Sequence, residues 1–352
     1  MLFIIGSSRI NLLVVSPIRE NNRFKVQAGL GTRNAGSCFI ILVMKKTQVR
    51  PRRIPGEALL LLTAAVWGTG FVAQRKAMEG MQPFAFIALR FFLGCLVLLP
   101  VLILRWVRQK PAAGAGSKWK AGFKRLAVPG MISGLFLFAG TSLQQLGIIT
   151  TSASKAGFLT SLYLVLVPLL GLLVGKKVNL WVWIGVVLAL AGVWFLSLNL
   201  EMSIQRGDIL ILIGALFWAL QILALDRFTQ DLDPLGLAFG QFFTAAILGL
   251  VVCLITEKGP LVTDSGAWMP LLYSGVAAVG IGFTLQVVGQ SMVDPALATL
   301  ILSLEAVFAL LGGMVFLGER LSGREWLGCG MMLAAVILVQ LKGEQQKTTD
   351  KG

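Results

Sequence analysis

The sequence predicts an all-α membrane protein with ten transmembrane helices, arranged as two inverted repeats of five helices each. Three observations predict this fold. Only 13% of the 352 residues are charged and 56% are hydrophobic, whereas soluble chains carry about 25% charged residues. Ten apolar stretches follow one another, most of them close to the roughly 20 residues that cross a bilayer as a helix. In addition, the two halves of the chain match each other in sequence.

The N-terminal part differs from the rest of the chain. Residues 1–43 mix short apolar pieces with Asn, Arg and Gly, and no piece reaches spanning length. No basic region precedes the first apolar piece, as it would in a signal peptide. We expect residues 1–43 to be a disordered extension or to lie upstream of a true start at Met44. Residues 44–56 are then a basic cytoplasmic tail.

From Glu57 onward, ten apolar stretches are candidates for membrane crossing. They are residues 57–73, 84–104, 126–148, 156–174, 180–198, 208–225, 235–255, 268–289, 295–317 and 326–341. If the basic tail is cytoplasmic, the alternate connections on that side hold 18 lysines and arginines and the opposite side holds 7. Positive residues collect on the cytoplasmic side, so we expect both termini there, with residues 342–352 as a C-terminal tail.

The two halves of the chain are predicted to be repeats, at residues 57–199 and 207–341. An offset of 151 positions aligns their first parts, and an offset of 142 aligns their later parts. The matched pairs include Trp67 with Trp218, Pro83 with Pro234, Phe91 with Phe242, Gln144 with Gln286, Ser161 with Ser303 and Tyr163 with Glu305. Because five helices are an odd number, the second repeat enters the membrane from the opposite side. Such inverted repeats can alternate between two packings around a central site.

Composition and motifs argue against several classes of function. The chain has no histidine and four scattered cysteines, which excludes His-based nucleophile pairs and His-ligated zinc. No phosphate-binding glycine loop is present, so we predict no cofactor and no metal. The net charge of +15 comes from basic residues beside the apolar stretches, which indicates membrane orientation and not nucleic-acid binding. An intramembrane enzyme would need paired catalytic groups at one depth, and the sequence offers few.

Three stretches resemble the EamA-type members of the drug/metabolite transporter superfamily. They are Trp67-Gly-Thr-Gly-Phe-Val-Ala-Gln-Arg-Lys76, Leu89-Arg90-Phe91-Phe92, and the segment from Ser303 to Glu319. The resemblance covers about residues 56–341. It implies ten helices, a central cavity, and export or import of small metabolites such as amino acids. Two departures concern gating detail: Ala306 stands where the family often has proline, and Lys177 stands where the second repeat has Glu319.

Glu305 and Arg90 are the ionisable candidates for a site inside the membrane. A charged group at that depth costs roughly 2.5–3.5 kcal/mol or more, so it should face the protein interior or a watery cavity. Glu305 could carry protons or bind a substrate amine, or it could form a structural ion pair or a helix cap. Arg90 could pair with Glu305, bind a substrate carboxylate, or support helix packing. Their counterparts in the other repeat are Tyr163 and Gln241. By contrast, we expect Asp208 to be solvated at a membrane edge.

Neutral polar and aromatic residues complete the predicted pathway. Amide side chains can join helices or line a hydrated cavity; the candidates are Gln144, Gln145, Gln286 and Gln290, with Gln74 and Gln221 as weaker ones. Trp67 and Trp218 lie in mid-helix, where they could stack on a cargo or fill the core. Ser303 adjoins Glu305 in the ninth stretch.

These features together predict a secondary active transporter in the inner membrane. It would move a small metabolite, such as an amino acid or a similar amphipathic solute, by alternating access, with efflux as the expected direction and protons as the coupling ion. The expected partners are this solute, protons and the lipid bilayer. An uptake permease of the same fold, or a non-transporting sensor or scaffold, are the alternatives. The oligomeric state is left open.

Overall fold

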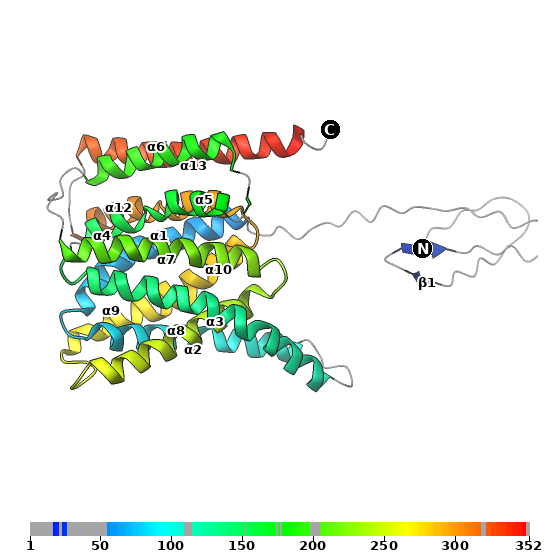
Figure 1. Ribbon diagram of the computed structural model, residues 1–352, viewed down its shortest axis with the longest axis horizontal. Helices are drawn as coiled ribbons and strands as arrows, with labels where there is room; N and C mark the ends of the chain where they lie inside the picture. The colour runs from blue at the N-terminus through cyan, green and yellow to red at the C-terminus, as the bar shows by residue number, and fades with distance from the viewer. Residues whose placement is uncertain are drawn as a thin grey trace, which may run out of the picture. The chain divides into compact units, whose positions relative to one another are not determined.

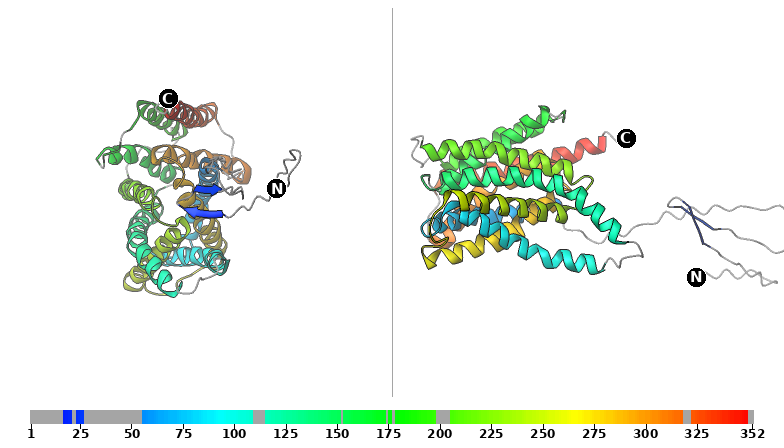
Figure 2. Two further views of the ribbon diagram at one scale, coloured as in Figure 1. Left: turned by 90° about the vertical axis from the view of Figure 1, so that its right-hand side faces the viewer. Right: turned by 60° about the horizontal axis from the view of Figure 1, so that its bottom comes forward.

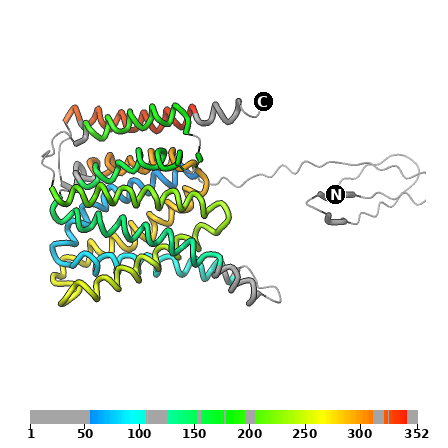
Figure 3. The backbone as a smooth tube through the Cα atoms, in the orientation of Figure 1, coloured from blue at the N-terminus to red at the C-terminus, as the bar shows by residue number. Residues whose placement is uncertain are grey.

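The computed structural model describes most of the chain from Pro55 onward and a short piece before it. The described residues are 17–20, 23–26, 55–108, 115–151, 153–173, 175–176, 178–197, 205–317 and 322–349. Figure 3 shows the residues of uncertain placement in grey. The chain divides into two compact units, residues 1–53 and 54–352.

The first unit contains a short β-hairpin. Strands β1 (Pro17–Glu20) and β2 (Arg23–Val26) pair antiparallel, with Pro17 opposite Val26 and Glu20 opposite Arg23. The expectation of disorder for residues 1–43 therefore does not extend to these eight residues, and the rest of that segment lies outside the described residues.

The regular elements described in the second unit are helices, and one isolated bridge joins Met81 to Val262. Its elements in the first half of the chain are α1 (Gly56–Ala77), α2 (Pro83–Arg108), α3 (Ala115–Gly147), α4 (Ala153–Thr160), α5 (Tyr163–Leu173) and α6 (Leu180–Ser197). Those in the second are α7 (Arg206–Phe228), α8 (Pro234–Thr256), η1 (Ser265–Ala267), α9 (Trp268–Leu272), η2 (Tyr273–Phe283), α10 (Thr284–Gln290), α11 (Pro295–Leu302), α12 (Glu305–Leu317) and α13 (Gly323–Thr349).

Seven helical spans of the described residues are long and apolar enough to cross a membrane. Three further apolar helices are shorter, at Leu180–Phe195, Pro295–Leu311 and Trp326–Lys342. Each of the ten predicted stretches coincides with one of these ten segments. The sequence thus located the apolar helices correctly, while seven of them reach spanning length.

Helices that are distant in sequence pack side by side. Helix α2 packs on α8, and α6 packs on α13 as a separate pair (Figure 1). Helix α3 contacts both α7 and α8, while α1 contacts α12 and the η2–α10 segment. Figure 2 shows the same bundle from one end and from below. Each half of the chain therefore packs largely on the other half.

Two of the predicted continuous helices are interrupted in the structure. The stretch 156–174 breaks at Ser161 and Leu162, between α4 and α5, and the stretch 295–317 breaks at Ser303 and Leu304, between α11 and α12. At each break the Ser side chain bonds to the preceding turn, since Ser161 Oγ donates to Gly157 O (2.7 Å) and Ser303 Oγ donates to Leu300 O (2.8 Å). Hydroxyls that bond to the backbone in this way often bend helices.

The stretch 268–289 is also more irregular than predicted. It contains the short helix α9, the eleven-residue π-helix η2 and then α10. Hydrogen bonds in a π-helix join residues five positions apart, and π-helical turns are frequent at functional sites. This one lies against α1 and α2.

Helices α2 and α8 are fastened together at both ends. The carboxylate of Glu257, after α8, accepts from the backbone N–H groups of Phe84 (2.7 Å) and Ala85 (2.8 Å) at the start of α2. At the other end, Arg105 of α2 forms an ion pair with Asp233 (3.2 Å), which caps α8. Carboxylates at helix N-termini satisfy free N–H groups and complement the helix dipole.

Candidate functional site

A cavity lies among the helices of both repeats. Seven of the eleven predicted site residues line it: Trp67, Arg90, Gln144, Tyr163, Trp218, Gln286 and Glu305. The weaker candidate Gln74 lines it as well. The remaining lining residues are Gly70, Phe71, Thr141, Thr160, Ile222, Ala278, Val279, Phe283 and Leu302. The structure therefore gathers the charged, aromatic and part of the amide candidates in one place.

Glu305 and Tyr163 both line this cavity and contact each other there. Each is the first residue of a helix that follows a break, Tyr163 in α5 and Glu305 in α12. Both side chains are buried, and the Tyr163 hydroxyl donates to Glu305 Oε1 at 3.3 Å. A carboxylate in the first turn of a helix is favoured by the helix dipole. The structural ion pair weighed for Glu305 does not form with any described lysine or arginine.

Arg90 is buried in the cavity wall without a carboxylate partner. Its NH1 donates to Gln74 Oε1 at 3.2 Å, and its guanidinium lies 5.1 Å from the ring centroids of both Phe86 and Phe91. Its Nε has no hydrogen-bond partner among the described residues. Pairing with Glu305, one of the alternatives for Arg90, is not formed; Gln74 and the two rings contact the guanidinium instead. The guanidinium of Arg90 and the carboxyl group of Glu305 thus line one cavity without forming an ion pair with each other.

Three aromatic rings form one wall of the cavity. Trp67 and Trp218 lie 6.4 Å apart between ring centroids, and Phe283 lies 4.5 Å from Trp67 and 5.7 Å from Trp218. The ring of Phe283 stacks on Trp218 with 14° between the planes. Gly282 permits this arrangement, because a Cβ there would come within 2.7 Å of Trp67 Nε1. Phe283 was not predicted, since it is one apolar residue within a long apolar stretch.

The two indole N–H groups have different partners. Trp67 Nε1 donates to the carbonyl of Ala278 in the π-helix at 3.1 Å. Trp218 Nε1 is buried and has no acceptor among the described residues. Buried polar groups are normally satisfied, so Trp218 offers an unused donor at the cavity wall.

The amide side chains form a chain that leads away from the cavity. Gln286 Nε2 donates to Gln221 Oε1 (3.4 Å), and Gln221 Nε2 donates to Gln241 Oε1 (3.1 Å). On the other side, Gln144 Nε2 lies 3.5 Å from Thr160 Oγ1. Gln286 and Gln144 therefore connect the cavity to neighbouring helices, and Gln221 has a larger role than its weak sequence signal indicated.

Four predicted site residues are not among those that line this cavity. Gln241 ends the amide chain just described, and Ser303 bonds within its own helix. Gln145 and Gln290 are buried, and neither amide atom of either side chain has a hydrogen-bond partner among the described residues. Sequence periodicity alone does not separate these amides from the ones that face the cavity.

Asp208 was predicted to be solvated at a membrane edge, and this prediction is wrong because the residue is buried. It is only 3% exposed. Its Oδ1 accepts from Thr151 Oγ1 (2.8 Å), and its Oδ2 accepts from the backbone N–H of Gln205 (2.8 Å) in a capping box at the start of α7.

The fold and cavity define a multi-pass membrane protein of the transporter class. The chain belongs to the EamA-like transporter family, whose model matches residues 54–198 and again residues 205–341. An uncharacterized transporter of Archaeoglobus fulgidus is 34% identical over 292 residues, which cover 83% of this chain and 87% of that protein.

Other relatives and a solved structure agree with this assignment. The uncharacterized inner membrane transporter YedA of Escherichia coli K12 is 26% identical, over 82% of this chain and 91% of YedA. The uncharacterized transporter YwfM of Bacillus subtilis is 29% identical, over 83% and 95% of the two chains. A protein crystal structure with 20% identity and a TM-score of 0.66 covers 83% of this chain and 98% of its own, which shows the same fold.

Proposed function

We propose that this protein is a secondary active transporter that moves a small metabolite through the described cavity by alternating access. The main support for this proposal is the hydrogen bond between Tyr163 and Glu305, which joins two interrupted helices at the cavity. Arg90 lines the same cavity. Transporters typically bind substrate and coupling ions near the membrane midplane, at discontinuous helices between repeats.

The proposed architecture is ten membrane-spanning helices in two inverted five-helix repeats. Two-fold symmetry brings a residue next to its own counterpart only near the symmetry axis. Three such pairs meet in this protein: Trp67 with Trp218, Tyr163 with Glu305, and Phe91 with Phe242, whose ring centroids lie 6.2 Å apart. The family match to each half of the chain supports the same arrangement. The axis would then pass through or beside the cavity.

We further propose that the protein lies in the inner membrane with both termini in the cytoplasm. The excess of lysine and arginine in alternate connections supports this orientation. The relative YedA is named an inner membrane transporter. The end of α7 that carries Asp226 would then face the cytoplasm.

The proposed cargo is an amino acid or a similar amphipathic solute. Glu305 is suited to a cationic amine, and the guanidinium of Arg90 is suited to a carboxylate, since guanidinium groups bind carboxylates with directed hydrogen bonds. The rings of Trp67, Trp218 and Phe283 offer an apolar surface to the rest of the solute. Because the described residues leave the two charges unpaired with each other, a zwitterion would satisfy both.

Glu305 is also the proposed proton carrier. A buried carboxylate that is exposed to each side in turn can load a proton on one side and release it on the other. Efflux is the favoured direction on family grounds, and an uptake permease would use the same cavity with the gradient reversed. A sensor or scaffold would bind the solute without moving it.

Flux measurements test the proposal. Metabolites are first screened for thermal stabilisation of the purified protein, and the hits are then assayed in proteoliposomes with an imposed pH gradient. Glu305→Gln is expected to abolish gradient-driven flux, while Asp231→Asn, which neutralises an exposed carboxylate at the end of α7, keeps it. Undiminished pH-driven flux in Glu305→Gln contradicts proton coupling, and solute binding without flux in the native protein contradicts transport.

A further inference from the structure

Helix α7 is tied to the first repeat at both of its ends. Asp208 lies in its first turn and Asp226 lies near its last residue. At about 1.5 Å per residue these two positions are about 27 Å apart along the helix, which is nearly the thickness of the hydrocarbon core. Trp218 and Ile222, between them, line the cavity. One helix thus connects two polar contacts on opposite faces of the bundle with the site between them.

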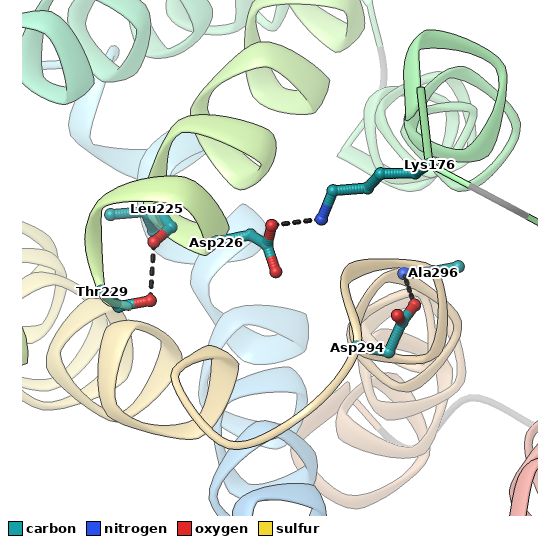
Figure 4. Close-up of polar contacts among 6 residues, drawn as sticks. All are labelled: Lys176, Leu225, Asp226, Thr229, Asp294 and Ala296. Carbon is teal, nitrogen blue, oxygen red and sulfur yellow. Dashed lines mark hydrogen bonds and ion pairs between the residues drawn. The ribbon is translucent and has the colours of Figure 1, made fainter. Parts of the chain in front are cut away.

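The contact at the end of α7 is an ion pair between Lys176 and Asp226 (Figure 4). Lys176 follows α5, where Gly175 adopts a left-handed conformation with φ of +79°. The backbone N–H of Lys176 donates to Gly171 O (2.9 Å), and the backbone N–H of Gly175 donates to Leu172 O (3.0 Å). This Schellman ending turns the chain away from the axis of α5, and the Lys176 side chain reaches across to α7.

The nearby carboxylate of Asp294 has a different task. Figure 4 shows that it points back to its own helix, where it accepts from the backbone N–H of Ala296 (3.0 Å) and caps α11. Lys176 therefore pairs with Asp226, while Asp294 caps its own helix. The side chain of Asp226 is 14% exposed and that of Lys176 is 35% exposed, so water reaches the pair at one rim.

The contact at the start of α7 is a hydrogen-bond network that joins an exposed arginine to two buried polar residues. Thr151 Oγ1 donates to Asp208 Oδ1 (2.8 Å), and Arg75 NH1 at the end of α1 donates to the carbonyls of Thr151 (2.5 Å) and Ile148 (3.3 Å). Thr151 and Asp208 are both buried. Like the ion pair, this network joins residues of the first repeat to α7.

We propose that the Lys176–Asp226 ion pair is a latch that closes the cavity at its own face of the membrane and opens when the transporter exposes the cavity there. The Arg75–Thr151–Asp208 network closes the opposite face. The inference rests on the alternating-access function proposed above. Two helices connect the ion pair to the cavity. Helix α5 begins at the cavity with Tyr163, and Lys176 follows its last turn. Helix α7 lines the cavity with Ile222, one turn before Asp226.

The partial exposure of the ion pair suits a contact that forms and breaks in each cycle. Ion pairs that water can reach contribute little to stability, so their rupture adds little to the barrier. Two other ion pairs lie near this face. Arg227–Asp231 lies within a single chain segment, and Arg105–Asp233 joins α2 to the capped start of α8; all four side chains are at least half exposed. Arg227–Asp231 joins no two helices, and Arg105–Asp233 holds α8, which contributes no residue to the cavity lining.

Labelling of a cavity cysteine from each face tests the latch. The native cysteines Cys38, Cys95, Cys253 and Cys329 are replaced by serine or alanine, and Ile222→Cys provides the reporter. A membrane-impermeant maleimide is then applied to vesicles of either orientation. Asp226→Asn is expected to raise the labelling rate about fivefold from the face where α7 ends, and to lower it from the other face. Lys176→Gln should give the same result independently.

The matched control is Asp231→Asn, which removes a carboxylate five residues away and should label at the parent rate. Labelling at the parent rate in both latch variants overturns the proposal, and so does an equal rise from both faces. The assay needs no substrate. Unchanged labelling in latch variants that still carry solute flux therefore contradicts the latch proposal alone. Absence of flux in the native protein contradicts the proposed transport function.

Discussion

The two interrupted helices of this transporter have the same shape but different chemistry. The α4–α5 and α11–α12 segments break at corresponding Ser-Leu pairs, each with a serine hydroxyl bonded to the preceding turn. The next residue is Tyr163 in one and Glu305 in the other. The comparison teaches that two similar helix breaks place different residues at the cavity, and that a single residue decides which position carries a carboxyl group.

The largest expected effect separates these two positions. Glu305→Gln should abolish proton-driven flux, whereas Tyr163→Phe should lower flux only about tenfold, because it removes one hydrogen bond to a charged group worth about 1.5 kcal/mol. Initial rates in proteoliposomes under a fixed pH gradient measure both. Equal losses in the two variants would mean that the hydrogen bond, and not the carboxylate, carries the function.

The tryptophan pair extends the same comparison. Trp67→Phe should lower the free energy of unfolding by about 1–3 kcal/mol, because it removes the hydrogen bond to the Ala278 carbonyl together with part of the ring packing. Trp218→Phe removes a donor that has no described acceptor, so it loses ring packing alone and should cost about 0.5–1.5 kcal/mol less than Trp67→Phe. Equilibrium unfolding in detergent micelles measures both values, with solute binding as a second readout.

If Trp218 donates to the solute, Trp218→Phe should weaken solute binding although it costs less stability than Trp67→Phe. A Trp218→Phe variant that is as destabilised as Trp67→Phe would contradict the assignment of unequal roles to the two repeat-related indoles.

The smallest expected effect concerns the breaks themselves. Ser161→Ala and Ser303→Ala each remove one hydrogen bond to the backbone within the chain, so each should cost about 0.5–1.5 kcal/mol of stability. The two values should agree within experimental error, because the two breaks are equivalent. Thermal unfolding of the purified variants measures this, and a severe loss in only one of them would show that the breaks are not equivalent.

Much of this protein could be predicted from its sequence. Apolar stretches located the helices, and the repeat offset matched Trp67 with Trp218 and Tyr163 with Glu305, which meet in the structure. Ionisable residues inside a membrane carry a high free-energy cost, so the sequence alone marked Glu305 and Arg90 as site candidates. Both line the cavity.

Other features had no local signal. The breaks at Ser161 and Ser303 lie in uninterrupted apolar stretches, and the π-helix η2 differs from an α-helix by hydrogen-bond register and not by composition. Phe283 resembles any lipid-facing or core residue until its neighbours are known. The Arg90–Glu305 pairing was not formed because Gln74 binds the guanidinium, and such side-chain choices depend on packing among four or more helices.

Topology mapping tests the central claim most directly, that two copies of a five-helix unit cross the membrane in opposite directions around the Tyr163–Glu305 pair. Single cysteines at Arg105, near the end of α2, and at Arg206, at the start of α7, are labelled with an impermeant reagent in vesicles of known orientation. Inverted repeats require an odd number of crossings between the two positions, so the account predicts labelling from opposite faces. Labelling of both from the same face would contradict it.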